Sequence, residues 1–69
     1  MTEYLVVIEK ADSNFSAYLP DLPGCVATGE TKDETLDQMR DAIAMHIQGL
    51  EEDRVSIPLS SSTADYIAF

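Results

Sequence analysis

Acidic side chains are the most numerous groups in this sequence that could do chemistry, with 13 Asp and Glu residues among 69. Acids that converge from the middle of a buried strand and its neighbours can hold divalent metals for phosphoryl transfer. Here the most apolar segment carries its acids, Glu3 and Glu9, only at its two ends, and Asp65 lies far along the chain. We therefore predict no metal site and no nuclease chemistry.

The single histidine and the single cysteine are the other candidates for catalysis. General-base chemistry at His46 would need an orienting carboxylate and a nucleophile, but its neighbours one helical turn away are Ala42 and Leu50. Cys25 has apolar neighbours, which do not favour the reactive thiolate. We predict that His46 is a partly buried structural residue and Cys25 a small buried hydrophobe. No catalytic residue and no cofactor is expected, and the protein is not predicted to be an enzyme.

A formal net charge of −9 is the strongest signal in the composition. The four basic residues are scattered, so no basic stripe can neutralise phosphates, and direct nucleic-acid binding is not expected. The same charge attracts a basic partner and speeds its encounter. Simple solubility is the alternative interpretation of this acidic balance.

The length and the cysteine count predict a single domain over residues 1–69 that is marginally stable alone. One cysteine cannot form an internal disulfide, and no cysteine–histidine cluster indicates zinc, so association is expected to supply stability. The N-terminus has no signal-peptide pattern. The longest apolar run, residues 5–8, is far shorter than the ~20 residues of a membrane helix, which favours a soluble, cytoplasmic protein with no membrane contact.

A β-hairpin is predicted at the start of the chain. Residues 3–11 are apolar on both alternating sides, which is typical of a central strand covered on both faces. The polar residues 12–14 favour a tight turn, and residues 15–20 then form the second, antiparallel strand.

A rigid corner follows the hairpin. Pro20 ends the second strand because it lacks the N–H that a sheet requires, and Pro23 with Gly24 predicts a turn. Residues 25–30 form a third short strand, in which Gly29 marks either a bulge or the end of the strand.

A helix is predicted from Thr31 to about Glu52. Thr31 and Glu34 have the spacing of a capping box, in which each side chain bonds the other's backbone N–H. One stripe of the helix is apolar and the opposite face is acidic. The stripe consists of Leu36, Met39, Ile43, Ile47 and Leu50. Met45 lies on the polar face, as a lone exposed residue or as a contact point.

The last predicted element is a fourth strand at residues 64–69, after a connection rich in proline and serine. The fold class is therefore α+β in the order β-β-β-α-β, with one helix on one face of a mixed four-stranded sheet. A right-handed crossover gives the sheet order 3-2-1-4. The other face carries either the set of Tyr4, Val6 and Ile8 or the set of Leu5 and Val7, and we expect a second chain to cover it.

Three motifs in this order resemble the HicB-like antitoxin family. The first is the end of the second strand, Leu19 to Cys25, which contains P-D-L-P-G-C. The second is Gly29-Glu30-Thr31, which leads into the helix, and the third is Ile57-Pro58, before the last segment. The resemblance covers nearly the whole chain. It implies a partial ribonuclease-H-like sheet without the nuclease acids, within a type II toxin–antitoxin module.

The resemblance also implies partners. HicB-like antitoxins bind a small basic HicA-type toxin, an mRNA interferase, and block its access to RNA, and they form homodimers or higher homo-oligomers. Many members of the family carry a C-terminal DNA-binding domain that binds the operator. This sequence resembles the short form without that domain, so the resemblance does not imply operator binding for this chain.

Four residues in and around the corner formed by Pro20, Pro23 and Gly24 are the candidates for partner binding, because we expect them to be exposed or charged. They are Tyr18, Asp21, Leu22 and Glu30. Two other functions stay open: an orphan oligomeric domain that binds an unknown protein or small molecule without a toxin, and an enzyme, which would need a convergent polar site.

Overall fold

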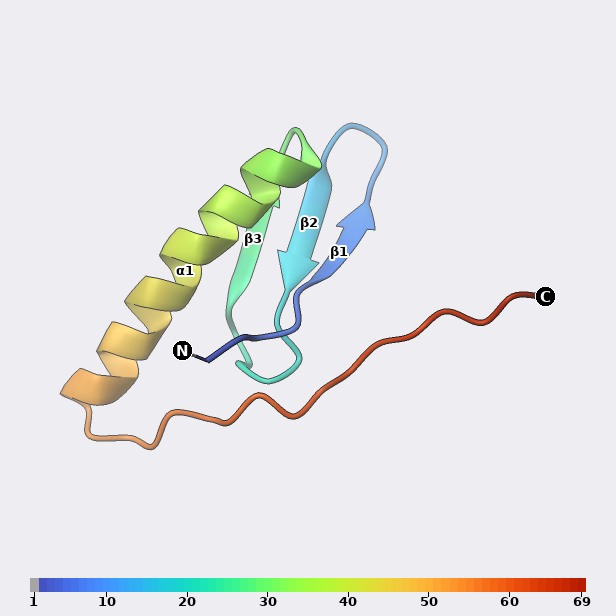
Figure 1. Cartoon of the computed structure of the whole chain (residues 1–69). Helices are drawn as coiled ribbons and strands as arrows, with labels where there is room; N and C mark the ends of the chain where they lie inside the picture. Colours follow the sequence, from blue (N-terminus) through green and yellow to red (C-terminus); the bar gives the residue numbers. More distant parts are fainter. Residues whose placement is uncertain (1) are drawn as a thin grey trace.

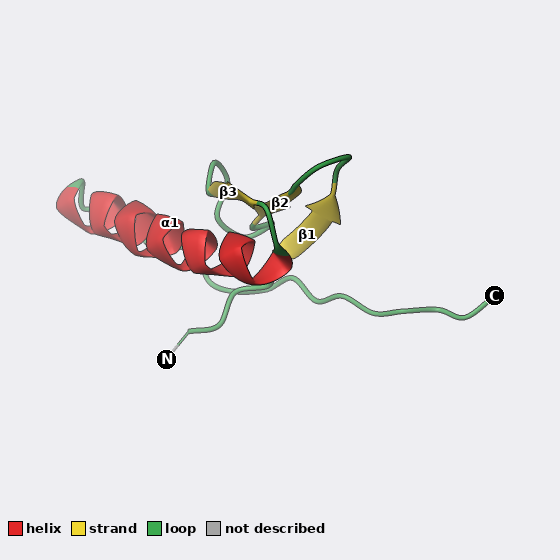
Figure 2. Ribbon diagram, turned by 90° about the horizontal axis from the view of Figure 1, so that it is seen from above, coloured by secondary structure: helices red, strands yellow, loops and turns green. Residues whose placement is uncertain are grey.

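The structure is a computed structural model that describes residues 2–69. Three strands are followed by one long helix: β1 (Val7–Lys10), β2 (Phe15–Tyr18), β3 (Val26–Gly29) and α1 (Lys32–Glu52). The strands form an antiparallel sheet in the order β1-β2-β3, and α1 crosses one face of it (Figure 1). Seen from above, helix and sheet make two layers, and the opposite sheet face has no covering element among the described residues (Figure 2). The three predicted strands and the helix are confirmed.

The core lies between the helix and the sheet. Five apolar side chains are buried there: Ala17, Leu19, Leu22, Cys25 and Met39. Tyr4, Val6 and Ile8 pack against this cluster, so they are the set that faces the helix. Because side chains alternate along a strand, Leu5 and Val7 point to the uncovered face. The structure thus decides between the two sets that the sequence left open.

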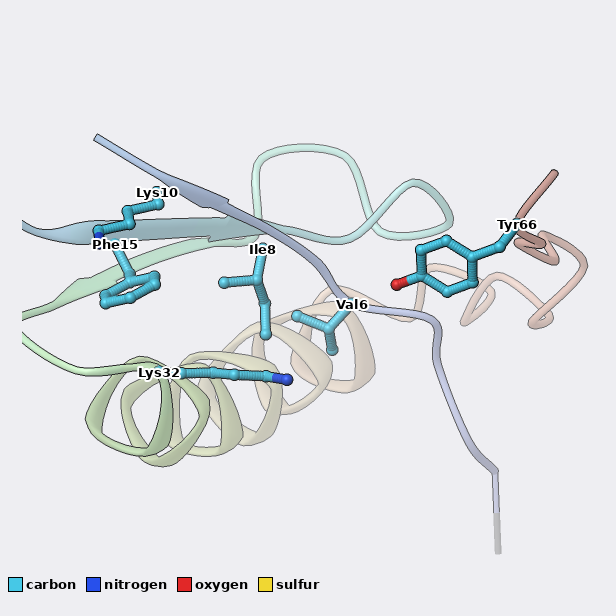
Figure 3. Close-up of a pocket in the computed structure, with 6 residues that line it drawn as sticks. All are labelled: Val6, Ile8, Lys10, Phe15, Lys32 and Tyr66. Atoms are coloured by element: carbon cyan, nitrogen blue, oxygen red, sulfur yellow. The ribbon is translucent and has the colours of Figure 1, made fainter. Parts of the chain in front are cut away.

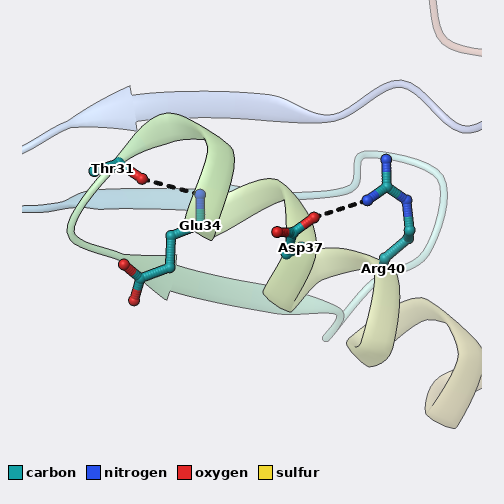
Figure 4. Close-up of polar contacts among 4 residues, drawn as sticks. All are labelled: Thr31, Glu34, Asp37 and Arg40. Atoms are coloured by element: carbon teal, nitrogen blue, oxygen red, sulfur yellow. Dashed lines mark hydrogen bonds and ion pairs between the residues drawn. The ribbon is translucent and has the colours of Figure 1, made fainter.

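The helix begins with the predicted Thr31 cap, which forms one of the two bonds of the predicted capping box. The backbone N–H of Glu34 donates a hydrogen bond of 3.0 Å to the Thr31 hydroxyl, which caps α1 (Figure 4). Thr35 is fully buried in the first turn, and its hydroxyl donates to the Thr31 carbonyl at 2.7 Å. Gly29 lies directly against this turn, since an added Cβ would stand 2.8 Å from the Thr35 backbone nitrogen. Gly29 therefore permits a close approach of β3 and α1.

The helix ends in a Schellman motif. The N–H of Arg54 bonds the Glu51 carbonyl at 3.1 Å, and the N–H of Val55 bonds the Leu50 carbonyl at 2.9 Å. Arg54 takes the left-handed conformation that this motif requires, with φ of 56°. Glycine is the residue usually found at this position, so the chain leaves the helix through a strained arginine.

The prediction of a fourth strand within the chain is wrong. Residues 64–69 are extended and exposed and pair with no strand in the described part of the chain. Their course is set by contacts of the preceding segment, first with Tyr4 and then with Asp21 in the loop between β2 and β3, after which the chain runs away from the body (Figure 1). The sheet therefore has three strands in the order β1-β2-β3 within the described residues, and not four strands in the predicted order 3-2-1-4. β1 is an edge strand rather than a central one, and it begins at Val7, later than predicted.

Candidate partner-binding surfaces

The uncovered sheet face carries one apolar row across all three strands. Val7 pairs with Tyr18, and Tyr18 pairs with Val26, so these side chains stand side by side on the face away from the helix. Tyr18 is 43% exposed and Val26 is 65% exposed. An exposed apolar row with a tyrosine at its centre has the composition of a protein interface core. We call this row the open face.

A polar row borders the open face. Glu9 pairs with Ser16, and Ser16 pairs with Thr28, one step along the strands from the apolar row. Glu30 follows β3 at the same end of the sheet and is exposed. No basic residue belongs to either row of cross-strand partners. The surface is therefore apolar at one end and acidic at the other.

The four candidates from the sequence do not form one site. Tyr18 lies on the open face, and Glu30 lies at the opposite end of the sheet, because β3 pairs through Gly29 with the start of β2. Leu22 was chosen for exposure at the tip of the corner, and this was wrong, since its side chain is fully buried. The corner turns inward there, because backbone bonds from Leu22 to Leu19 and from Cys25 to Leu22 close two successive turns.

Asp21 binds a segment of its own chain. Its carboxylate accepts backbone N–H bonds from Ser61 at 2.9 Å and Ser62 at 3.0 Å, and hydroxyl bonds from Ser61 at 3.2 Å and Ser62 at 2.8 Å. The Ser62 N–H, followed by the other three donors, holds the pKa of Asp21 below its ordinary value of 3.8. Asp21 thus anchors the segment after the helix, a role that the sequence analysis missed. The paired serines at 61 and 62 were its only sequence signal.

The chain beyond this anchor is the most exposed apolar part of the molecule. Before the anchor, the Tyr4 hydroxyl donates a 2.6 Å bond to the Pro58 carbonyl. After it, Tyr66 is 98% exposed and Ile67 is 86% exposed, and Phe69 is fully exposed. We call residues 63–69 the tail. Side chains of this kind are normally buried, so the tail is a candidate contact segment.

The expected burial of Cys25 and the expected partial burial of His46 are confirmed. Cys25 is 3% exposed, its sulfur lies 3.8 Å from the Met39 sulfur, and burial raises the pKa of its thiol. His46 is half-buried on α1. Within residues 2–69 no three metal-ligating side chains come close enough together to hold an ion. No helix in this range is long and apolar enough to cross a membrane.

Comparison with known proteins decides the family. The pattern described as "HicB_like antitoxin of bacterial toxin-antitoxin system" matches residues 4–68. The chain belongs to the HicB-like antitoxin family. A solved structure entitled "HicA3 and HicB3 toxin-antitoxin complex" is similar to it, with a TM-score of 0.71 and 31% identity over 90% of this chain and 70% of that chain. The resemblance seen in the sequence motifs is confirmed.

Curated relatives extend the family to phage, bacteria and archaea. An uncharacterized 14.9 kDa protein of Haemophilus phage HP1 is 36% identical over 93% of this chain, which spans about half of the phage protein's length (48%). A UPF0150 protein of Helicobacter pylori is 36% identical over 72% of this chain and 69% of that protein. A UPF0150 protein of Thermoplasma acidophilum is 37% identical over 81% of this chain and 83% of that protein.

Proposed function

We propose that this HicB-like domain neutralises a small basic HicA-type mRNA interferase by binding it and blocking its access to RNA. The single observation that carries the proposal is the likeness to the chain from the HicA3–HicB3 toxin–antitoxin complex. In this proposal the domain is non-catalytic and acts in the cytoplasm, where the toxin meets mRNA. It binds no nucleic acid directly and works as a homo-oligomer.

The open face is the surface that we assign to the toxin. Its apolar row of Val7, Tyr18 and Val26 offers an anchor that excludes water, and Glu9 and Glu30 lie at its acidic end. A net charge of −9 steers a basic protein toward the domain. Of the original candidates, Tyr18 and Glu30 remain contact residues in this proposal, whereas Asp21 acts by placing the tail.

Co-expression with the toxin encoded by the adjacent gene tests the function. We expect the domain to relieve the growth arrest and to co-purify with the toxin in a complex that weakens as salt is raised. If the arrest persists and no complex is recovered, the toxin-binding function is refuted. The orphan domain with an unknown protein or small-molecule partner is then favoured.

A pair of matched variants tests the surface. Val26→Arg places a positive charge in the apolar row, and we expect it to abolish recovery of the complex because a basic toxin would be repelled. Leu59→Arg adds the same charge at an equally apolar, 84% exposed position outside the open face, and should bind normally. Equal loss in both variants would show that net charge, not this surface, governs binding.

A further inference from the structure

The free edge of β1 borders a groove on the helix side of the sheet. β1 pairs only with β2 among the described strands, so its outer backbone groups have no strand partner. The groove of about 310 Å³ beside this edge is lined by apolar side chains of Val6, Ile8 and Phe15 (Figure 3). An exposed edge next to an apolar groove is a template for the addition of another strand.

The groove is basic, although the protein is acidic. Lys10 and Lys32 line it, and they are two of only four basic residues in the chain. Arg40, another of the four, is paired with Asp37 at 2.8 Å on the exposed side of α1 (Figure 4). The groove therefore fits an extended segment that is apolar and carries a negative charge, and it would repel a basic toxin.

The tail has this chemistry in a definite order. In an extended conformation Asp65, Ile67 and Phe69 share one side. On the groove side of β1 the order is Val6, Ile8 and then Lys10. Antiparallel addition brings Asp65 opposite Lys10 and places Ile67 and Phe69 along Ile8 and Val6. Parallel addition would instead place Asp65 opposite Val6, at the apolar end of the groove and far from Lys10.

The tail cannot reach this arrangement on its own copy. The anchor at Ser61 and Ser62 lies on Asp21, just beyond the end of β2 that pairs with the start of β1. The three steps from Ser62 to Asp65 span at most about 10 Å, which is too short to pass the whole of β1 and turn back. Tyr66 is one of the residues that line the groove of its own copy, but its side chain stays 98% exposed (Figure 3). The rest of the tail runs away from the body (Figure 1).

We propose that residues 63–69 of one copy add as an antiparallel strand to the β1 edge of a second copy, and that the two copies exchange tails reciprocally. A two-fold dimer satisfies both edges with the same contact. Each exchanged aromatic ring buries about 150–250 Å². Phe69 from both tails thus brings about 300–500 Å² to the interface, to which the two Ile67 side chains and the paired backbones add, while Tyr66 lies on the other side of the added strand.

The oligomeric state of matched variants tests the exchange. The full chain should sediment as a dimer at micromolar concentration. Ile67→Asp should raise the dimer dissociation constant at least about tenfold, because a charge would be buried in the apolar groove. Leu59→Asp, which changes an 84% exposed residue before the anchor, should remain dimeric. A monomeric full chain, or an Ile67→Asp variant that associates normally, would overturn the proposal.

Cross-linking distinguishes exchange from every other dimer. Asp65→Cys and Lys10→Cys are made in separate chains of different mass, while Cys25 stays inaccessible in the core. Mixed under oxidising conditions, they should form a disulfide between the two chains as the major product. A disulfide that forms only when both cysteines share one chain would show that the tail folds back on its own edge.

A double reversal, Lys10→Glu with Asp65→Lys, should restore the dimer that Lys10→Glu weakens.

Discussion

Gly29→Ala gives the sharpest test of how β3 and α1 are joined. The added Cβ would stand 2.7 Å from the Thr35 hydroxyl, 2.8 Å from the Thr35 backbone nitrogen and 3.1 Å from its Cα. Two of these three atoms belong to the backbone of the first helical turn, so no side-chain rotation relieves the overlap. The helix start must move away from β3, which loosens the packing of buried Thr35.

The size of the effect follows from the cost of overpacking, about 1–3 kcal/mol. A domain of this length has a total stability of roughly 3–10 kcal/mol, so the loss is a large fraction of it. Urea unfolding at fixed protein concentration measures the change. With an m-value of about 1 kcal/mol per molar urea, the midpoint should fall by ~1–3 M.

Two other glycines provide controls for the same substitution. Gly49 lies in α1 with open space around it, so Gly49→Ala should raise stability by about 0.5–1 kcal/mol through helix propensity. Gly24 also has open space but a φ of 86°, so Gly24→Ala should lower stability by backbone strain alone. If Gly29→Ala is as stable as the parent or Gly49→Ala, the close approach of β3 and α1 is refuted.

Three further changes probe the core and the path after the helix. Arg54→Gly should raise the free energy of unfolding by about 0.5–1 kcal/mol, and hence the urea midpoint, because glycine relieves the left-handed φ of 56°. An unchanged or lower midpoint would contradict the Schellman end. Met39→Ala should cost about 2–5 kcal/mol and lower the urea midpoint followed by circular dichroism, whereas Met45→Ala, at a 73% exposed position, should have little effect. Asp21→Asn should speed amide exchange at Ser61 and Ser62 without changing exchange in the sheet. In the parent, the Ser62 N–H and the other three donors at Ser61 and Ser62 hold the pKa of folded Asp21 below 3.8, so the anchor is intact above pH 3.8 and is lost as the pH falls through the folded pKa. Ser61 and Ser62 amides that stay protected below that pKa would refute the anchor.

The sequence predicted the parts of the fold that depend on local chemistry. Thr31 caps the helix because its hydroxyl sits three residues before a free backbone N–H, a relation that needs no tertiary contact. The hairpin and the corner at Pro23 and Gly24 were likewise readable from turn residues. Alternation showed that both sides of the first strand were apolar, but it could not decide which side faces the helix.

The errors arose where distant segments meet. Leu22 looked exposed because it lies between prolines, yet two backbone turns direct it into the core. The fourth strand was inferred from the end of the proline- and serine-rich connection and from the crossover rule, and neither supplies a neighbouring strand for residues 64–69. Asp21 and the serines at 61 and 62 are 40 residues apart, and their spacing carries no periodic signal.

The corner from Pro20 to Cys25 therefore has two structural tasks that lie on opposite sides of the backbone. Leu22 and Cys25 close the core from within, while Asp21 holds the tail from outside. Because the two tasks use different side chains, they can be separated by substitution. Loss of the Asp21 anchor should change where the tail points, and hence the assembly, while the buried cluster keeps the body folded. In the tail exchange that we propose, the motif that marks the family would therefore link the fold of one copy to the way in which two copies combine.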